Sequence, residues 1–202
     1  CGIYCATLNG ERFSMPLAPG VTDYNKRIQY QTYDITSMLK YMNTLEIQLA
    51  DGWYRGSTGA WGITNQYGTQ TKFIAELEIF YADGEVKKIV TDGTWNWSND
   101  GEIRFADNKD GEIVDARMTP SYGKFAKVTN NNVVPVCSNN VPIAEKERFK
   151  PTASKTLSGK TLLEFPNNLA GYISFSLSAN AGEKIKMRFG EMLDKNGELT
   201  LK

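Results

Sequence analysis

The chain has 202 residues, and 23 Lys and Arg side chains balance 23 Asp and Glu side chains, so its formal net charge is zero. This balance argues against a nucleic-acid partner, because phosphate binding requires a basic face and no cluster of basic residues stands out. Histidine is absent, which excludes Ser–His and Cys–His catalytic pairs and histidine-ligated zinc from within this chain. No apolar run approaches the roughly 20 residues of a membrane-spanning helix.

Apolar and polar residues alternate in several segments, which predicts β-strands. The first such segment is 45–49, and the second, 73–81, is followed by a turn at 82–85 and a partner strand at 86–90. The same alternation at 173–179 and 185–189, joined by a turn at 180–183, predicts a second hairpin. These segments are typical of antiparallel sheets with one apolar face.

Helical periodicity is scarce. It predicts one short turn at 37–40, with Asp34 or Thr36 as its cap. Many short strands and Gly-rich turns favour an all-β fold, namely an antiparallel β-sandwich of the jelly-roll or galactose-binding type with a partial second β-sandwich unit.

The composition changes after residue 137, where prolines and charged residues replace the alternating pattern. We therefore predict a β-sandwich domain over 1–137, a linker over 138–154 and an incomplete second β-domain over 155–202. The chain opens at Cys1 without an initiator Met, which favours a piece of a longer protein. Cys1 and Cys5 are about 13 Å apart on one strand, too far for a disulfide, and Cys137 is left over.

Glycines and aromatic residues are densest over 50–68. Trp and Tyr offer flat apolar faces, while an Asp beside an Arg supplies an acceptor and a fork of donors, a mixture that suits a neutral sugar. The candidate carbohydrate-binding residues are Asp51, Trp53, Tyr54 and Arg55, with Asp23 and Asn65 as neighbours. In the alternative interpretation, the two aromatic rings cap the core and the charged pair braces a Gly-rich crossover.

The acidic stretch 107–115 suggests calcium, but Lys109 at the third position and the missing glutamate at the twelfth do not fit an EF-hand. A calcium site of another type and a solvated loop both remain open. Glycoside hydrolysis needs two carboxyl groups at a set separation across a cleft. Asp92, Asp107, Asp110, Glu112 and Asp115 offer carboxylates but no such placement, so we expect no catalysis by this chain.

Ordered blocks across roughly 2–118 resemble the N-terminal domain of bacterial α-L-rhamnosidases (glycoside hydrolase family 78). They include Asp51-Gly52-Trp53-Tyr54-Arg55-Gly56 and the blocks at 8–12, 17–24, 31–36, 91–95 and 111–117. The segment 164–172 is similar to the block that opens the family's next β-domain, with Pro166 and Asn167 in place of the family's Gly and Gln. Val21 stands where the family often has Trp.

The resemblance implies a non-catalytic accessory fragment of a rhamnosidase-like enzyme, without its first strand and without the helical barrel that carries the catalytic acids. It implies rhamnoside recognition, in related modules with the help of calcium, and packing against the remaining domains of the parent enzyme. The alternative is a structural docking sandwich that binds no sugar. We expect no cofactor other than a structural calcium, and neither a nucleic-acid nor a membrane partner.

Overall fold

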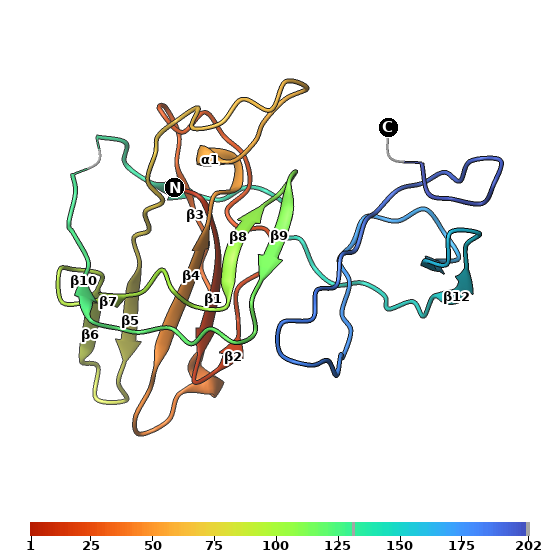
Figure 1. Ribbon diagram of the computed structural model, residues 1–202. Coiled ribbons are helices and arrows are strands. Elements are labelled where there is room, and N and C mark those ends of the chain that lie inside the picture. The colour runs from red at the N-terminus through yellow and green to blue at the C-terminus, as the bar shows by residue number, and fades with distance from the viewer. Residues whose placement is uncertain (131, 201–202) are drawn as a thin grey trace. The chain divides into compact units, whose positions relative to one another are not determined.

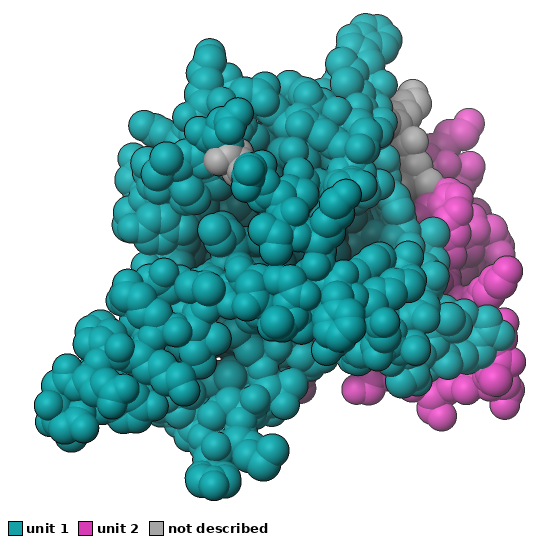
Figure 2. Space-filling view, turned by 90° about the vertical axis from the view of Figure 1, so that its left-hand side faces the viewer, with its two compact units in different colours: residues 1–144 teal, residues 145–202 magenta. Residues whose placement is uncertain are grey.

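The computed structural model describes residues 1–130 and 132–200, which form two compact units, 1–144 and 145–202 (Figure 1). Figure 2 colours the two units separately and shows that the visible face of unit 1 is uneven, with hollows between projecting groups of atoms. The boundary at 144 lies inside the segment predicted as a linker. The extents predicted for the two domains stay predictions, and residues 131, 201 and 202 lie outside the described residues.

Unit 1 is organised around a three-stranded antiparallel sheet in the order β2 (Glu11–Arg12), β1 (Ile3–Leu8), β4 (Leu45–Ala50). The pairing of β1 with β4 runs from Ile3 opposite Ala50 to Leu8 opposite Leu45, which confirms the strand predicted over 45–49. Alternate side chains of a strand share one face, and on β1 the buried ones are Ala6 and Leu8.

The small core of unit 1 lies where β1 meets the segment that follows β2. Ala18 and Tyr24 are buried together with the inward side chains of β1. The Tyr4 N–H donates to the Ala18 carbonyl at 3.0 Å, and the Ala6 N–H donates to Ser14 Oγ at 2.9 Å. On the edge of β1 that faces away from β4, these backbone N–H groups thus form hydrogen bonds with the segment that follows β2.

Three further antiparallel pairs extend unit 1. The predicted hairpin is confirmed as β5 (Glu76–Phe80) and β6 (Val86–Val90), and its first strand begins three residues later than the alternation. β8 (Ile103–Asp107) pairs with β9 (Gly111–Val114). β7 (Asn96–Trp97) pairs with β10 (Lys124–Phe125). The predicted all-β class is confirmed, and the chain has the strand-rich character of a β-sandwich.

One strand pair of unit 1 runs parallel. β3 (Gln29–Tyr30) lies beside β11 (Val136–Cys137). The buried carboxamide of Gln29 reinforces this pair, because its Nε2 donates to Asn139 Oδ1 at 2.9 Å and its Oε1 accepts from Asn140 Nδ2 at 2.8 Å. Two-residue strands show no periodicity, so the sequence did not predict this pair.

The helices are short. A 3₁₀ turn spans Thr36–Met38, so it begins one residue and ends two residues before the predicted turn. Its N-cap is Ile35, so the predicted cap at Asp34 or Thr36 was wrong, although Asp34 Oδ1 accepts from the Thr36 N–H at 2.9 Å. The second helix, α1 (Gly52–Arg55), was not predicted. No helix among the described residues has the length and apolarity to cross a membrane. All three cysteines are free thiols.

Over the described residues 145–200, unit 2 contains one hairpin, β12 (Thr152–Lys155) with β13 (Thr161–Glu164). The hairpin predicted from 173–179 and 185–189 was wrong: neither segment is a strand, although the Glu183 N–H donates to the Asn180 carbonyl at 3.0 Å in the predicted turn. Apolar side chains of both segments stay exposed, with Phe189 at 70%. A two-stranded ribbon is marginal without a third strand or a packing layer, and unit 2 buries neither face.

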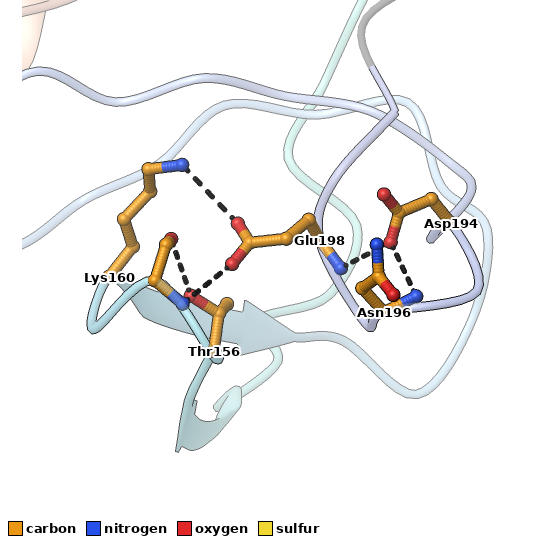
Figure 3. Close-up of polar contacts among 6 residues, drawn as sticks. Thr156, Lys160, Asp194, Asn196 and Glu198 are labelled. Atoms are coloured by element: carbon orange, nitrogen blue, oxygen red, sulfur yellow. Dashed lines mark hydrogen bonds and ion pairs between the residues drawn. The ribbon is translucent and has the colours of Figure 1, made fainter.

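A carboxylate joins two turns of unit 2 (Figure 3). Glu198 Oε1 accepts from the Ser158 N–H at 2.9 Å, and its Oε2 lies 3.3 Å from Lys160 Nζ. Asp194 Oδ1 in turn accepts from the backbone N–H groups of Asn196 and Glu198 at 2.8 and 2.9 Å. The turn that joins β12 to β13 is therefore tied to the turn at 194–198 by side-chain oxygens.

The bonds to Glu198 predict a titration in acid. Hydrogen bonds from the hydroxyl and backbone N–H of Ser158 and from Thr156 lower the pKa of Glu198 to about 2. A lowered pKa means that the bridge stabilises unit 2 above the ordinary glutamate pKa and is lost as pH falls toward 2. The Ser158 amide resonance should therefore titrate with a midpoint near the lowered pKa in ¹H–¹⁵N spectra.

Glu198→Gln should abolish this transition, and the matched control Glu191→Gln, on an exposed carboxylate of the same unit, should leave it unchanged. A Ser158 midpoint at the ordinary glutamate pKa would contradict the bridge.

Candidate functional site

The site begins where β4 passes directly into α1 (Figure 1). Gly52, the first residue of α1, is buried and has φ +52°. A Cβ placed there would lie 2.7 Å from the backbone N of Ile3. This close approach seats α1 against β1 and fixes the position of the side chains on either side of Gly52.

Asp51 and Arg55 lie one helical turn apart and form an ion pair, with Arg55 Nε 3.0 Å from Asp51 Oδ1. The N–H does not point at that oxygen, and Nε is shielded from solvent without a hydrogen bond to any described residue. Both side chains are about one-third exposed or less, at 36% and 26%. The Asp51–Arg55 pair that was expected to brace the Gly-rich crossover is therefore present. The Nε–H of Arg55 makes no hydrogen bond within it.

The same two side chains line a groove of about 240 Å³ between the end of β4 and β8. Its apolar wall combines Leu49 and Ala50 with Ile103, Phe105 and Ala106. Sequence reasoning missed the β8 wall. The available signal was weak, because a bulge between Ile103 and Phe105 interrupts the strand's regular alternation.

Arg104 also lines this groove but is held by backbone. Its Nη1 donates to the Asn99 carbonyl at 3.2 Å and to the Gly101 carbonyl at 2.9 Å. These bonds direct part of the guanidinium toward the loop before β8. The groove therefore combines one carboxylate and two guanidinium groups with an apolar wall.

Tyr54 lies apart from this groove, in a cluster of tyrosine rings. Its ring centroid is 5.6 Å from that of Tyr24, which in turn lies 5.0 Å from that of Tyr67. The buried Tyr24 donates its hydroxyl to the Gly20 carbonyl at 2.6 Å. Burial, and then the neighbouring Tyr67, raises the pKa of Tyr24 to about 12, so the phenol stays neutral.

The cluster borders a second hollow of about 310 Å³, and Tyr54 and Tyr24 are among its lining residues. Tyr54 thus packs against other rings, as the core-capping interpretation expects.

The remaining predicted residues, Trp53, Asn65 and Asp23, line neither hollow. Trp53 is 37% exposed on α1. Asn65 donates its backbone N–H to the Arg55 carbonyl at 2.8 Å, which folds the following loop against the helix. Asp23 accepts from the Asn25 N–H at 3.2 Å and pairs with Lys26 at 3.3 Å, within its own turn. The structure brings together Asp51 and Arg55 in the groove, and Tyr54 lies elsewhere.

Asp107, in the acidic stretch, connects the two walls of the groove. Its Oδ2 accepts from the Ser57 N–H at 2.8 Å, and its Oδ1 accepts from the N–H groups of Lys109 and Asp110 at 2.7 and 2.9 Å. Burial raises the pKa of Asp107, but these three N–H groups outweigh that effect and hold the pKa below its usual range. The carboxylate thus fastens the β8–β9 hairpin to the loop after α1.

The other end of the acidic stretch is also paired, since Asp115 forms a two-fold contact with Arg117 at 2.8 and 2.7 Å. Among residues 1–130 and 132–200, no group of three or more Asp, Glu or Cys side chains lies close enough to hold a metal. The suggested calcium site stays a prediction.

Sequence reasoning did not select Trp61, whose side chain is 90% exposed. It lies in a turn closed by two backbone hydrogen bonds between Thr58 and Ile63, at 2.9 and 3.0 Å. Trp61 and Trp53 share the segment from α1 to β5, and Trp61 is the more accessible indole of the two. Its position within the Gly-rich segment was the available signal.

The strands and the lateral groove define an all-β domain of the β-sandwich class. The family described as the α-L-rhamnosidase N-terminal domain matches residues 1–156, and the bacterial α-L-rhamnosidase concanavalin-like domain matches residues 154–202. The chain belongs to the α-L-rhamnosidase N-terminal domain family.

Relatives cover nearly the whole chain. An α-L-rhamnosidase of Streptomyces avermitilis is 35% identical over 98% of this chain and 20% of its own length. One from Alteromonas sp. strain LOR is 30% identical over 96% of this chain and 23% of its own length. The chain spans about a fifth of the length of the curated relatives it matches.

Solved structures agree. The crystal structure of S. avermitilis α-L-rhamnosidase complexed with L-rhamnose has 36% identity and a TM-score of 0.71, over 80% of this chain and 17% of that protein. The native α-L-rhamnosidase of Aspergillus terreus has 27% identity and a TM-score of 0.73, over 80% of this chain and 20% of that protein. The predicted family resemblance is confirmed.

The close approach at Gly52 predicts a specific destabilisation. Gly52→Ala adds a methyl group against Ile3 at a positive φ, whereas Gly10→Ala, at φ +82°, adds one in open space. The control should cost roughly 1–2 kcal/mol from backbone strain alone, and Gly52→Ala should cost clearly more. Urea unfolding midpoints measure the difference, and equal losses would show that α1 is not held against β1.

Asp107→Asn should loosen the groove, because an amide offers one acceptor oxygen where the carboxylate uses both. We expect a loss of about 1–3 kcal/mol in the free energy of unfolding and faster hydrogen exchange of the Ser57 amide. Asp110→Asn is the matched control, since its carboxylate lies exposed in the same turn. Unchanged Ser57 exchange in Asp107→Asn would refute the connection.

Proposed function

We propose that this chain is a non-catalytic accessory part of an α-L-rhamnosidase-like glycoside hydrolase and helps it to recognise rhamnose-containing carbohydrate. The observation that supports this is the groove in which Asp51 and Arg55 face an apolar wall from β8. Relatives named α-L-rhamnosidase match nearly the whole of this chain, which supports the same activity for the parent protein.

The chemistry of the groove suits a small neutral sugar. Asp51 accepts hydrogen bonds from hydroxyl groups, and the exposed part of the Arg55 guanidinium donates them. The apolar side chains of Leu49, Ile103 and Phe105 suit the ring C–H groups and the methyl group of a 6-deoxy sugar. A groove of about 240 Å³ lies below the range for drug-sized ligands and favours a single sugar unit. Few contacts imply a millimolar affinity, about 4 kcal/mol.

The groove's charge pattern supports a role in recognition without hydrolysis. Glycosidases place two carboxyl groups across the scissile bond. Of the described residues that line this groove, Asp51 alone is a carboxylate, and Arg55 pairs with it. The groove therefore lacks, among its described lining residues, the second carboxylate that such a mechanism requires.

Exposed strand residues favour a second role, packing against the remaining domains of the parent enzyme. Side chains on β5, β6 and β9 are apolar and accessible, including Phe80, Val90, Ile113 and Val114, with Phe80 at 73%. Apolar patches on a domain surface mark interaction sites when they are contiguous. A purely structural docking domain would use this surface and leave the groove without a ligand.

Calorimetric titration of the full chain with L-rhamnose tests the groove, with and without calcium. Arg55→Lys keeps the positive charge and loses the planar fork of donors, so we expect the dissociation constant to rise about tenfold, or 1.4 kcal/mol. Arg117→Lys, on a guanidinium paired with Asp115, should bind as the wild type does.

Absence of binding by the wild-type chain would refute sugar recognition and leave the docking role. Release of nitrophenol from an aryl rhamnoside by the purified chain would refute the non-catalytic assignment.

A further inference from the structure

Trp61, whose side chain is 90% exposed, lies in a turn closed between Thr58 and Ile63 in the loop after α1. The Thr58 N–H donates to the Ile63 carbonyl at 2.9 Å, and the Ile63 N–H donates to the Thr58 carbonyl at 3.0 Å. Gly59 and Gly62 have φ +65° and +61°, values that a side chain would strain. The turn thus holds a defined shape with its indole in solvent, at 90% exposure.

This turn is fastened to the β8–β9 hairpin. Lys109 Nζ donates to the Gly59 carbonyl at 2.5 Å, and the Ser57 N–H donates to Asp107 Oδ2 at 2.8 Å. Asp107 directly follows the four β8 residues, 103–106, that line the groove. The turn with Trp61 is therefore attached to the same hairpin that forms one wall of the groove.

The immediate neighbours of the indole favour a sugar over a protein. Gly59, Ala60 and Gly62 are small, so they leave the faces of the indole open. A protein interface needs a contiguous patch of several large side chains around such an anchor, whereas a pyranose ring can stack its C–H face on one aromatic ring. Thr58 and Gln66 add polar groups at the base of the turn, where Thr58 Oγ1 donates to Gln66 Oε1 at 3.1 Å.

We propose that Trp61 forms a second sugar subsite, which stacks on another unit of the carbohydrate whose rhamnosyl unit lies in the groove. This inference rests on the proposed function, and it adds that the chain recognises an oligosaccharide better than a monosaccharide. A ligand that reaches both places gains affinity because the second contact forms at high effective concentration.

The test compares L-rhamnose with an α-linked rhamnose tetrasaccharide, by calorimetric titration of the full chain. The wild type should bind the tetrasaccharide more tightly. Trp61→Ala should weaken tetrasaccharide binding about tenfold, as expected for the loss of an aromatic contact, and leave the affinity for L-rhamnose unchanged. Trp61→Phe should retain part of the gain.

Tyr41→Ala, on a fully exposed ring in the loop before β4, is the matched control and should change neither affinity. As a second readout, the tetrasaccharide should protect the wild-type chain's indole fluorescence from acrylamide quenching, and this protection should vanish in Trp61→Ala.

The outcomes separate the two proposals. A wild type that binds neither sugar refutes the proposed function together with this subsite. A wild type that binds L-rhamnose, with equal tetrasaccharide affinity in Trp61→Ala, overturns the subsite and leaves the groove intact. Concentration-dependent self-association that Trp61→Ala abolishes, with sugar binding unchanged, would assign the indole to a protein contact and overturn the subsite.

Discussion

The carboxylate of Asp107 is the interaction on which the candidate site depends. It accepts three backbone N–H groups, one from the loop after α1 and two from the hairpin to which it belongs. Ser57 is buried, and an unpaired buried N–H group is costly, so this single side chain holds together two segments that are 50 residues apart. Asp107 follows the β8 wall of the groove, and Ser57 lies between Arg55 of the other wall and the turn with Trp61, so this contact links all three.

Patterns of sufficient length predicted the fold well. The segment 45–49, and residues 76–80 of the segment 73–81, became strands because regular alternation reports the sheet face directly. Strands of two residues, such as β3 and β11, have no period and escaped prediction. The segments 173–179 and 185–189 have the period of strands, yet periodicity shows only which face would be buried. Over the described residues 145–200 no side chain is buried, so neither segment packs against a covering layer of this unit.

The site was predicted in part. Asp51 and Arg55 were selected as a donor–acceptor pair, and the structure places both in one groove. Tyr54, which was selected with them, packs among tyrosine rings, because neighbouring residues on one helical turn point in different directions. The opposite wall comes from β8, whose contact with β4 is tertiary and has no local signature. Residue types indicated the chemistry of the site, whereas the strand that forms its opposite wall was determined by the tertiary topology.

The parallel pairing of β3 with β11 has a consequence for the order of assembly. Its partners are separated by more than one hundred residues, and the Gln29 carboxamide reaches Asn139 and Asn140 across that interval. Closing such a long loop has a high entropic cost, which only contacts formed earlier can offset. During synthesis the antiparallel pairs β5–β6, β8–β9 and β7–β10 of unit 1 have emerged before residue 136, so this edge closes late. A nascent chain that stops before that residue leaves the strand at Gln29 without β11.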